Sequence, residues 1–136
     1  MGFDPITGTQ EQADAMFAAE AKILRSSGFR NGCPVASVAL DVASTTDRVR
    51  KPCADVFASW IRALAEGIAA SGIPEEMATD LASYILASLE GAIILSRTSR
   101  SVRPLEQTAQ FVLHTLEDQL PRRMRKAKNA RPGVKS

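Results

Sequence analysis

The stretch from Pro74 to Arg100 constrains the fold most, because it reads as one long helix that is apolar on nearly every side. Pro74 suits the first position of a helix, where no backbone N–H donor is needed. Glu75 and Glu76 at the start, and Arg97 near the end, match the two poles of the helix dipole. A helix with so few polar positions must be covered on most of its surface. We expect the chain's own core to cover one side and another subunit to cover the other.

A membrane-spanning helix is the competing interpretation of this stretch. Asp80 and Glu90 interrupt it, and several small polar residues leave no unbroken run of about 18 apolar residues. Alanine, serine and glycine positions also allow close approach of neighbouring helices. We therefore predict a packed helix of a soluble bundle and no membrane partner.

Composition favours a single all-α domain. The chain has 136 residues, 45% of them apolar and only 5% aromatic, and it is rich in helix-forming residues. The first 20 residues lack a basic start followed by an apolar block, so no signal peptide is expected. Two cysteines are too few for a disulfide framework. These features predict a cytoplasmic protein with reduced thiols.

Turn signals and helical spacing predict five helices, at about 10–27, 34–43, 47–71, 74–100 and 104–127. Residues 1–9 are expected to form a flexible lead-in, with Thr9 capping the first helix. On the second helix, Val35, Val38, Ala39 and Val42 are expected to point inward. Pro52 conflicts with a helix interior, so a short turn at 47–50 is expected before the main third helix. Pro121 should end the packed part of the last helix, which gives a helical domain over 10–120.

Charge is divided unevenly along the chain. All 15 acidic residues fall within 1–120, whereas seven of the 17 basic residues fall within 122–136. Such a block is typical of a solvated segment, so residues 121–136 are predicted to be a basic, partly disordered tail. The alternative is weak contact with phosphates without sequence preference.

No catalytic or metal-binding constellation stands out. His114 has no ligand partner at a suitable spacing, and Cys33 and Cys53 lack the paired spacing of a zinc site. We therefore expect no catalytic residues, no metal and no cofactor, and a protein that is not an enzyme. One alternative stays open: a thiol at a helix start, such as Cys33, can be reactive. Otherwise it is a small buried packing residue.

A small-ligand site is predicted around Trp60 and Tyr84, the only residues of their kinds in the chain. Apolar walls with a few polar groups are typical of such sites, and the ligand would be small and largely apolar. Plain core filling is the alternative for each aromatic residue. The proposed lining residues are Trp60, Tyr84, Phe57, Ser88, Cys33 and Phe17.

Three short patterns occur in the same order as in a known family. They are Gly32-Cys33-Pro34-Val35-Ala36, the spacing Cys53…Phe57…Trp60, and Leu89-Glu90-Gly91-Ala92 followed by Arg97. Over residues 26–117 the chain resembles the C-terminal domain of TetR-family transcriptional regulators, of the LmrA/YxaF type.

This resemblance implies a five-helix sensor domain around a small-molecule pocket. It also implies that the last two long helices pair with a second copy in a dimeric four-helix bundle. In the family, DNA is bound through an N-terminal helix-turn-helix domain, which we expect to be absent from this chain. The chain could be a fragment, have a misassigned start, or be a stand-alone sensor. Helix faces place Leu86, Glu90, Ile93, Leu105, Ala109, Val112, Leu113 and Leu116 at the expected dimer interface.

Three functions compete at this stage. The first is a ligand-sensing and homodimerisation domain of a transcriptional regulator. The second is a helical dimerisation module without a ligand, which could form mixed dimers with full-length regulators. The third is an enzyme that uses Cys33. The first requires a cavity beside Trp60, and the second requires that region to be filled.

Overall fold

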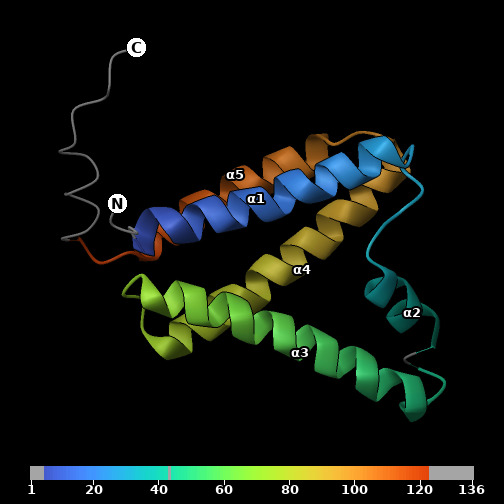
Figure 1. Cartoon of the computed structure of the whole chain (residues 1–136), viewed down its shortest axis with the longest axis horizontal. Helices are drawn as coiled ribbons and strands as arrows, with labels where there is room; N and C mark the ends of the chain where they lie inside the picture. The colour runs from blue at the N-terminus through green and yellow to red at the C-terminus, as the bar shows by residue number, and fades with distance from the viewer. Residues whose placement is uncertain (1–4, 43, 123–136) are drawn as a thin grey trace.

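The structure, a computed structural model, describes residues 5–42 and 44–122, with only the backbone for residues 5–8. Its described part consists of five helices joined by short connections, as Figure 1 shows. The all-α prediction is confirmed. The helices are α1 (Pro5–Ser26), α2 (Pro34–Val42), α3 (Asp47–Ala70), α4 (Glu75–Ser99) and α5 (Arg103–Gln119).

The first helix begins earlier than the sequence predicted. It starts at Pro5, so the expected lead-in is wrong for residues 5–9. Proline fits the first turn of a helix because its φ is already helical. Thr9 does not cap the helix from outside; its hydroxyl donates to the carbonyl oxygen of Gly67 in α3, at 3.0 Å.

The predicted turn before Pro52 is also wrong. Helix α3 starts at Asp47 and continues through Pro52. The hydroxyl of Thr46 accepts a hydrogen bond from the backbone N–H of Arg48 at 3.2 Å, which caps the helix. Pro52 cannot donate to the carbonyl oxygen of Arg48, but both residues are exposed, so water can satisfy that oxygen.

The last helix ends earlier than the predicted bound near residue 127, at the place where Pro121 was expected to end its packed part. α5 stops at Gln119, and Leu120 is extended, as expected for a residue that precedes proline. Leu120 still packs into the core. The predicted disorder of the basic tail concerns residues 123–136, which lie outside the described residues.

The helices form two layers, with α1 and α3 in front and α4 and α5 behind. Helix α1 packs mainly on α5, α3 packs mainly on α4, and α4 and α5 pack side by side behind them (Figure 1). Contacts between α1 and α3 are fewer, so the front layer is splayed over α4. Buried residues from α1, α3, α4 and α5 form one apolar core. This arrangement places α4 beneath the space between α1 and α3.

Helix α4 is the one helix of the described residues that is long and apolar enough to span a membrane. It contains nine buried residues, seven of them in the apolar core, and it packs against α1, α3 and α5. A central core helix needs the same apolar composition, and its packing accounts for that composition here.

Helix α2 is the least covered element. It has no fully buried residue and packs against α3. Val38 is 45% exposed and Leu40 is 73% exposed, so the prediction that Val38 points inward is wrong. A helix that packs mainly against one other helix can cover only a narrow strip of its own surface.

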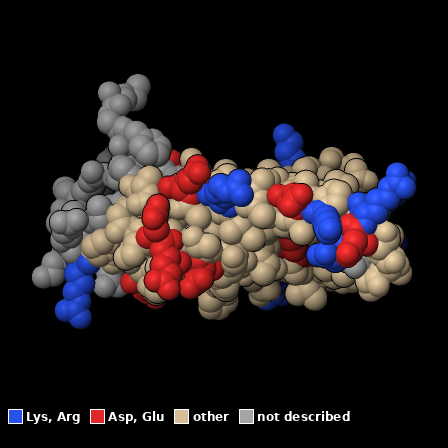
Figure 2. Space-filling view, turned by 90° about the horizontal axis from the view of Figure 1, so that it is seen from below, with Lys and Arg blue, Asp and Glu red and all other residues tan. Residues whose placement is uncertain are grey.

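The ion pairs of the described side chains lie on the surface. Arg25 meets Glu106 at 3.5 Å between α1 and α5, and Arg50 meets Asp47 at 2.8 Å within α3. Figure 2 shows a group of acidic side chains toward the left of the face seen from below, and acidic and basic side chains mixed toward the right. Exposed pairs of this kind contribute about 0–1 kcal/mol each, so the apolar core dominates stability.

Candidate functional site

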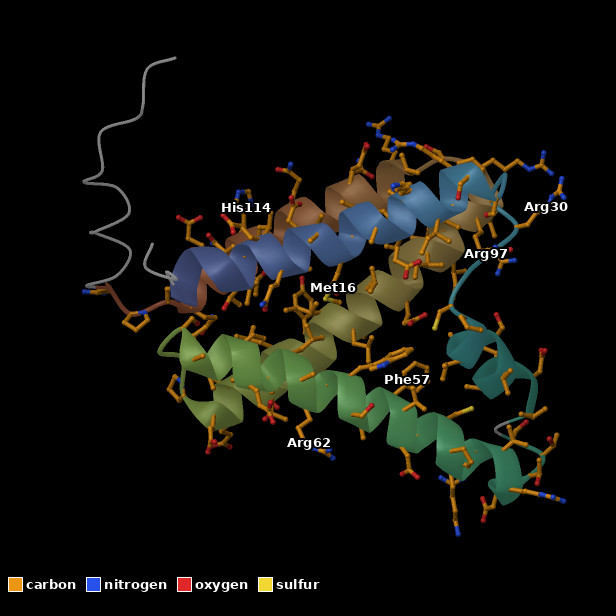
Figure 3. The ribbon with its side chains drawn as sticks, in the orientation of Figure 1. Met16, Arg30, Phe57, Arg62, Arg97 and His114 are labelled. Atoms are coloured by element: carbon orange, nitrogen blue, oxygen red, sulfur yellow. The ribbon has the colours of Figure 1, made fainter. Side chains whose placement is uncertain are left out.

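An aromatic pair on α3 faces the space between the front helices. The rings of Phe57 and Trp60 meet edge to face, with centroids 5.6 Å apart and an interplanar angle of 79°. In Figure 3, Met16 from α1 and Phe57 from α3 both extend into the space between these two helices. Trp60 remains 38% exposed, so its ring is not simply core filling.

Three polar groups from different parts of the chain converge at α4. Glu20 comes from α1, Cys33 directly precedes α2, and Glu90 comes from the middle of α4. The thiol of Cys33 donates a hydrogen bond to the carboxylate of Glu90. Burial raises the pKa of Glu90, and burial together with the charge of Glu90 raises the pKa of Glu20. Because these carboxyl groups interact electrostatically, they belong to one site.

The same surroundings argue against a reactive thiol. Burial raises the pKa of Cys33, and Glu90 raises it further, although the N–H of Ala36 contacts the sulfur at 3.5 Å. A raised pKa lowers the fraction of thiolate, which is the nucleophile. The structure therefore favours Cys33 as a packing residue and hydrogen-bond donor.

Arg97 holds the segment that carries Cys33. Its Nη2 atom donates to the carbonyl oxygen of Arg30 at 2.7 Å (Figure 3). A Cβ atom at Gly32 would lie 3.0 Å from Nη1 of Arg97, so glycine gives the guanidinium group room to pass. Gly32 and Arg97 thus gain a structural role in fixing the loop between α1 and α2 to α4.

The other predicted lining residues lie elsewhere. Phe17 is only 2% exposed and belongs to the core, so the core-filling interpretation holds for it. Tyr84 is 41% exposed, and Ser88, one turn later, is half-buried. On a helix of 3.6 residues per turn, Tyr84 lies about 120° around the axis from Glu90. Tyr84 therefore faces a different side of α4 from the polar group at Glu90.

The predicted dimer residues mostly lie inside a single chain. Six of them are 7% exposed or less, Leu113 packs partly buried against the same core, and Glu90 faces Cys33. That assignment of faces is corrected, because packing among the helices of one chain already covers these side chains. The six are Leu86, Ile93, Leu105, Ala109, Val112 and Leu116.

Large apolar side chains instead remain on the outer sides of α4 and α5. They point away from the core positions, at spacings that place most of the α4 members on one helix face. We call this set the outer apolar face. It comprises Met77 (41% exposed), Tyr84 (41%), Ile94 (47%), Leu95 (60%) and Phe111 (69%).

Two surface hollows lie away from the aromatic pair. One of about 320 Å³ lies between α1 and α5 and includes His114, which is exposed. The other, of about 580 Å³, lies between α3 and α4. Within the described residues no group of three His, Cys, Asp or Glu side chains is placed to hold a metal ion.

The sequence of this chain matches a known protein family. Residues 9–111 match the family described as "Transcriptional regulator LmrA/YxaF-like, C-terminal domain". The chain belongs to this family of TetR-type regulators. The resemblance seen in the three sequence patterns is thereby confirmed. The fold of five helices agrees with such a domain.

The relatives are transcriptional regulators. An uncharacterized HTH-type regulator of Mycobacterium tuberculosis is 35% identical over 123 residues, which cover 87% of this chain and 63% of the relative. The regulator YxaF of Bacillus subtilis is 33% identical over 60% of this chain and 42% of its own length. The repressor DhaR of a Mycobacterium species is 28% identical over 62% of this chain and 46% of its own length. The prediction that the domain is not an enzyme is confirmed by this kinship.

The domain spans less than two thirds of the length of these relatives. No solved structure shows a significant match to it.

Glu20 was not predicted from the sequence, and Glu90 was assigned to the dimer interface instead of this polar group. A carboxylate in the middle of an otherwise apolar helix was a usable signal for Glu90, since a buried charge needs a functional or structural partner. Nothing in the local sequence distinguishes Glu20 from other polar positions on α1. Its role becomes visible only when α1 and α4 are placed together.

Replacing Glu90 with glutamine should stabilise the domain at neutral pH. A carboxyl group with a raised pKa in the folded state favours folding below its unfolded pKa, and this contribution is lost as pH rises through the folded pKa. The usual value is 4.5, so Glu90→Gln should raise the melting temperature by a few degrees at pH 7 and have little effect below pH 4.5. Melting curves from pH 3.5 to 8 measure this.

Glu106→Gln is the matched control for this variant, because Glu106 is exposed and pairs with Arg25. It should give no stabilisation at pH 7. A Glu90→Gln protein that is less stable than wild type at pH 7 and equally stable at low pH would contradict the assigned environment.

Proposed function

We propose that this chain is the small-molecule-sensing and homodimerisation domain of a TetR-type transcriptional regulator, acting in the cytoplasm. Membership of the LmrA/YxaF-like family supports the general role. The sensing function rests on the convergence of Glu20, Cys33 and Glu90, together with the Phe57–Trp60 pair on α3, the helix that packs mainly on α4. Such a mixture of apolar walls and few polar groups is typical of a ligand site.

The proposed site uses α4 as its floor and α1 and α3 as its sides. Since α1 and α3 share few contacts, a ligand between them replaces little existing packing. A bound ligand would fix the distance of α1 from α3. Helix α1 begins at Pro5, at the end where the family's DNA-binding domain would precede it. A ligand that shifts α1 would therefore also shift the DNA-binding domain.

The polar groups restrict the ligand's chemistry. Ionised carboxylates only accept hydrogen bonds, so Glu20 and Glu90 favour a ligand with a donor or a positive charge. Aromatic faces such as those of Phe57 and Trp60 also attract cations. The ligand is therefore expected to be small and largely apolar, with a donor or cationic group at one end.

The outer apolar face is the proposed dimer surface. Five large apolar side chains exposed on α4 and α5 suit an interface with a second copy of the same face. Pairing α4 and α5 with their counterparts would make a four-helix bundle. An obligate interface of this type buries about 2,000 Å² or more.

Trp60→Ala should weaken ligand binding without dissociating the dimer. Ligands are found by screening small apolar and amine-bearing compounds for shifts in Trp60 emission and in melting temperature. For a compound found in this way, calorimetric titration of Trp60→Ala should show about two- to tenfold weaker binding, since contact with an aromatic ring contributes about 0.5–1.5 kcal/mol.

Tyr84→Phe is the control, because Tyr84 lies on the outer apolar face and should leave the ligand's Kd unchanged. If no compound shifts either signal, the sensing proposal fails. The alternative is then a helical dimerisation module without a ligand, for which the outer apolar face alone is sufficient.

The chain of residues 1–136 should show no sequence-selective DNA binding. Any affinity should come from the basic residues of 122–136 and should fall steeply with salt, because phosphate contacts release counterions. DNA recognition in this family is proposed to require a helix-turn-helix domain outside this sequence. Gel-shift titrations at two salt concentrations measure this, and selective binding that resists salt would contradict it.

A further inference from the structure

The hollow between α3 and α4 has an apolar floor and an acidic rim. The floor comes from alanines and one isoleucine of α3, and the rim carries three carboxylates against one guanidinium group. In Figure 3, Arg62 points from α3 away from α1, toward the face that Figure 2 shows. We call this hollow the α3–α4 groove. Its lining residues are Ala58, Ile61, Arg62, Ala65, Glu66, Ala69, Glu75, Glu76 and Thr79.

The rim carboxylates are not engaged in the ion pairs of the described side chains, which join Arg25 to Glu106 and Arg50 to Asp47. Glu75 and Glu76 lie in the first turn of α4 and interact favourably with its dipole. They nevertheless remain exposed, as does Glu66. The groove therefore presents negative charge above an apolar surface.

The chain leaves α5 at the same end of the molecule as this groove. The N-terminal part of α1 lies beside the C-terminal part of α5, where both line one hollow. Thr9 of α1 in turn contacts Gly67 of α3 at 3.0 Å. Leu120 is anchored in the core and Arg122 follows, exposed. Figure 1 shows the ends of α3 and α5 at the same end of the fold.

We propose that the segment 123–136 docks into the α3–α4 groove of its own chain. The segment lies outside the described residues, and its sequence contains six basic residues and no acidic one. At about 3.3 Å per residue, its 14 residues reach about 45 Å, whereas the α3 side of the groove, residues 58–69, is about 17 Å long. The segment is therefore long enough to cover the groove.

The chemistry of the two surfaces is complementary. Lysine and arginine can lay their aliphatic stems on the alanines of the floor while their charged ends reach Glu66, Glu75 and Glu76. Because the ion pairs are exposed, salt screens them strongly. Docking also occupies basic groups that would otherwise contact DNA phosphates. The groove thus competes with nucleic acid for the same segment.

Carbodiimide cross-linking of the full chain, followed by peptide mass spectrometry, tests this docking. The expected links join Lys126, Lys128 or Lys135 to Glu66, Glu75 or Glu76, and they disappear at high salt. Mixing ¹⁴N- and ¹⁵N-labelled chains distinguishes links within one chain from links between chains. Links scattered over all exposed carboxylates, or links mainly between differently labelled chains, overturn the proposal.

A charge-neutral groove provides a second measurement. Trypsin should cleave within 123–136 roughly fivefold faster in the triple variant Glu66→Gln, Glu75→Gln, Glu76→Gln than in wild type, as expected from losing three exposed ion pairs. The control triple variant, Asp41→Asn, Asp55→Asn, Glu106→Gln, should be cleaved at the wild-type rate. Equal cleavage rates of all three proteins overturn the proposal. This holds even if added DNA slows cleavage of the segment.

Discussion

Phe111→Glu should convert the protein from a dimer of twice 14.6 kDa to a folded monomer of 14.6 kDa. Phe111 is 69% exposed on α5, where it contributes no packing to the core of its own chain. In the proposed dimer its ring lies in the interface, and a buried unpaired carboxylate there would cost several kcal/mol. Loss of a central aromatic contact adds about 2 kcal/mol or more.

Light scattering at micromolar concentration measures the mass, and circular dichroism verifies that helix content is retained. Leu40→Glu is the matched control, since Leu40 on α2 is 73% exposed but lies outside the outer apolar face. It should remain dimeric. A monomeric wild type, or a Phe111→Glu protein that is still dimeric, would contradict the proposed surface.

Val112→Asp should unfold the protein instead of merely dissociating it. Val112 follows Phe111 in sequence, yet its side chain is completely buried within one chain. Aspartate is similar in size, so the main effect is an unpaired carboxyl group in an apolar core. We expect a loss of about 4 kcal/mol or more in the free energy of unfolding.

Urea denaturation followed by circular dichroism measures this loss. The comparison with Phe111→Glu is informative because the two positions are adjacent in sequence but lie about 100° apart around α5, one exposed and one buried. If Val112→Asp gave a stable, folded monomer, Val112 would have to lie at a subunit interface, and the core described above would be wrong.

Much of the fold could be predicted from the sequence because apolar spacing and helix-ending residues act locally. The pattern from Pro74 to Arg100 predicted a central helix, and α4 has that position. Pro121 ended the packed region as expected. The failures at Thr9 and Pro52 have different causes. Helix α1 extends back past Thr9, which bonds to Gly67 of α3, and α3 continues through Pro52 because the carbonyl oxygen that loses its donor is exposed.

The faces of the helices were less predictable. A position that faces a chain's own core and one that faces a partner share the same spacing, so Val112 and Leu116 could not be told from interface residues by sequence. Glu90 could be placed beside Cys33 and Glu20 only once α1, α2 and α4 were assembled. Of the predicted ligand residues, the structure brings together Phe57 and Trp60, and it places Cys33 with Glu90.

The central claim is that a small molecule binds over α4 between α1 and α3. Hydrogen exchange of the full chain, with and without the compound that most strongly shifts Trp60 emission, tests it most directly. We predict slower exchange in the parts of α1, α3 and α4 around Glu20, Phe57 and Glu90, and no change around Phe111. Slower exchange confined to the outer apolar face, or no compound that alters exchange anywhere, would contradict the claim.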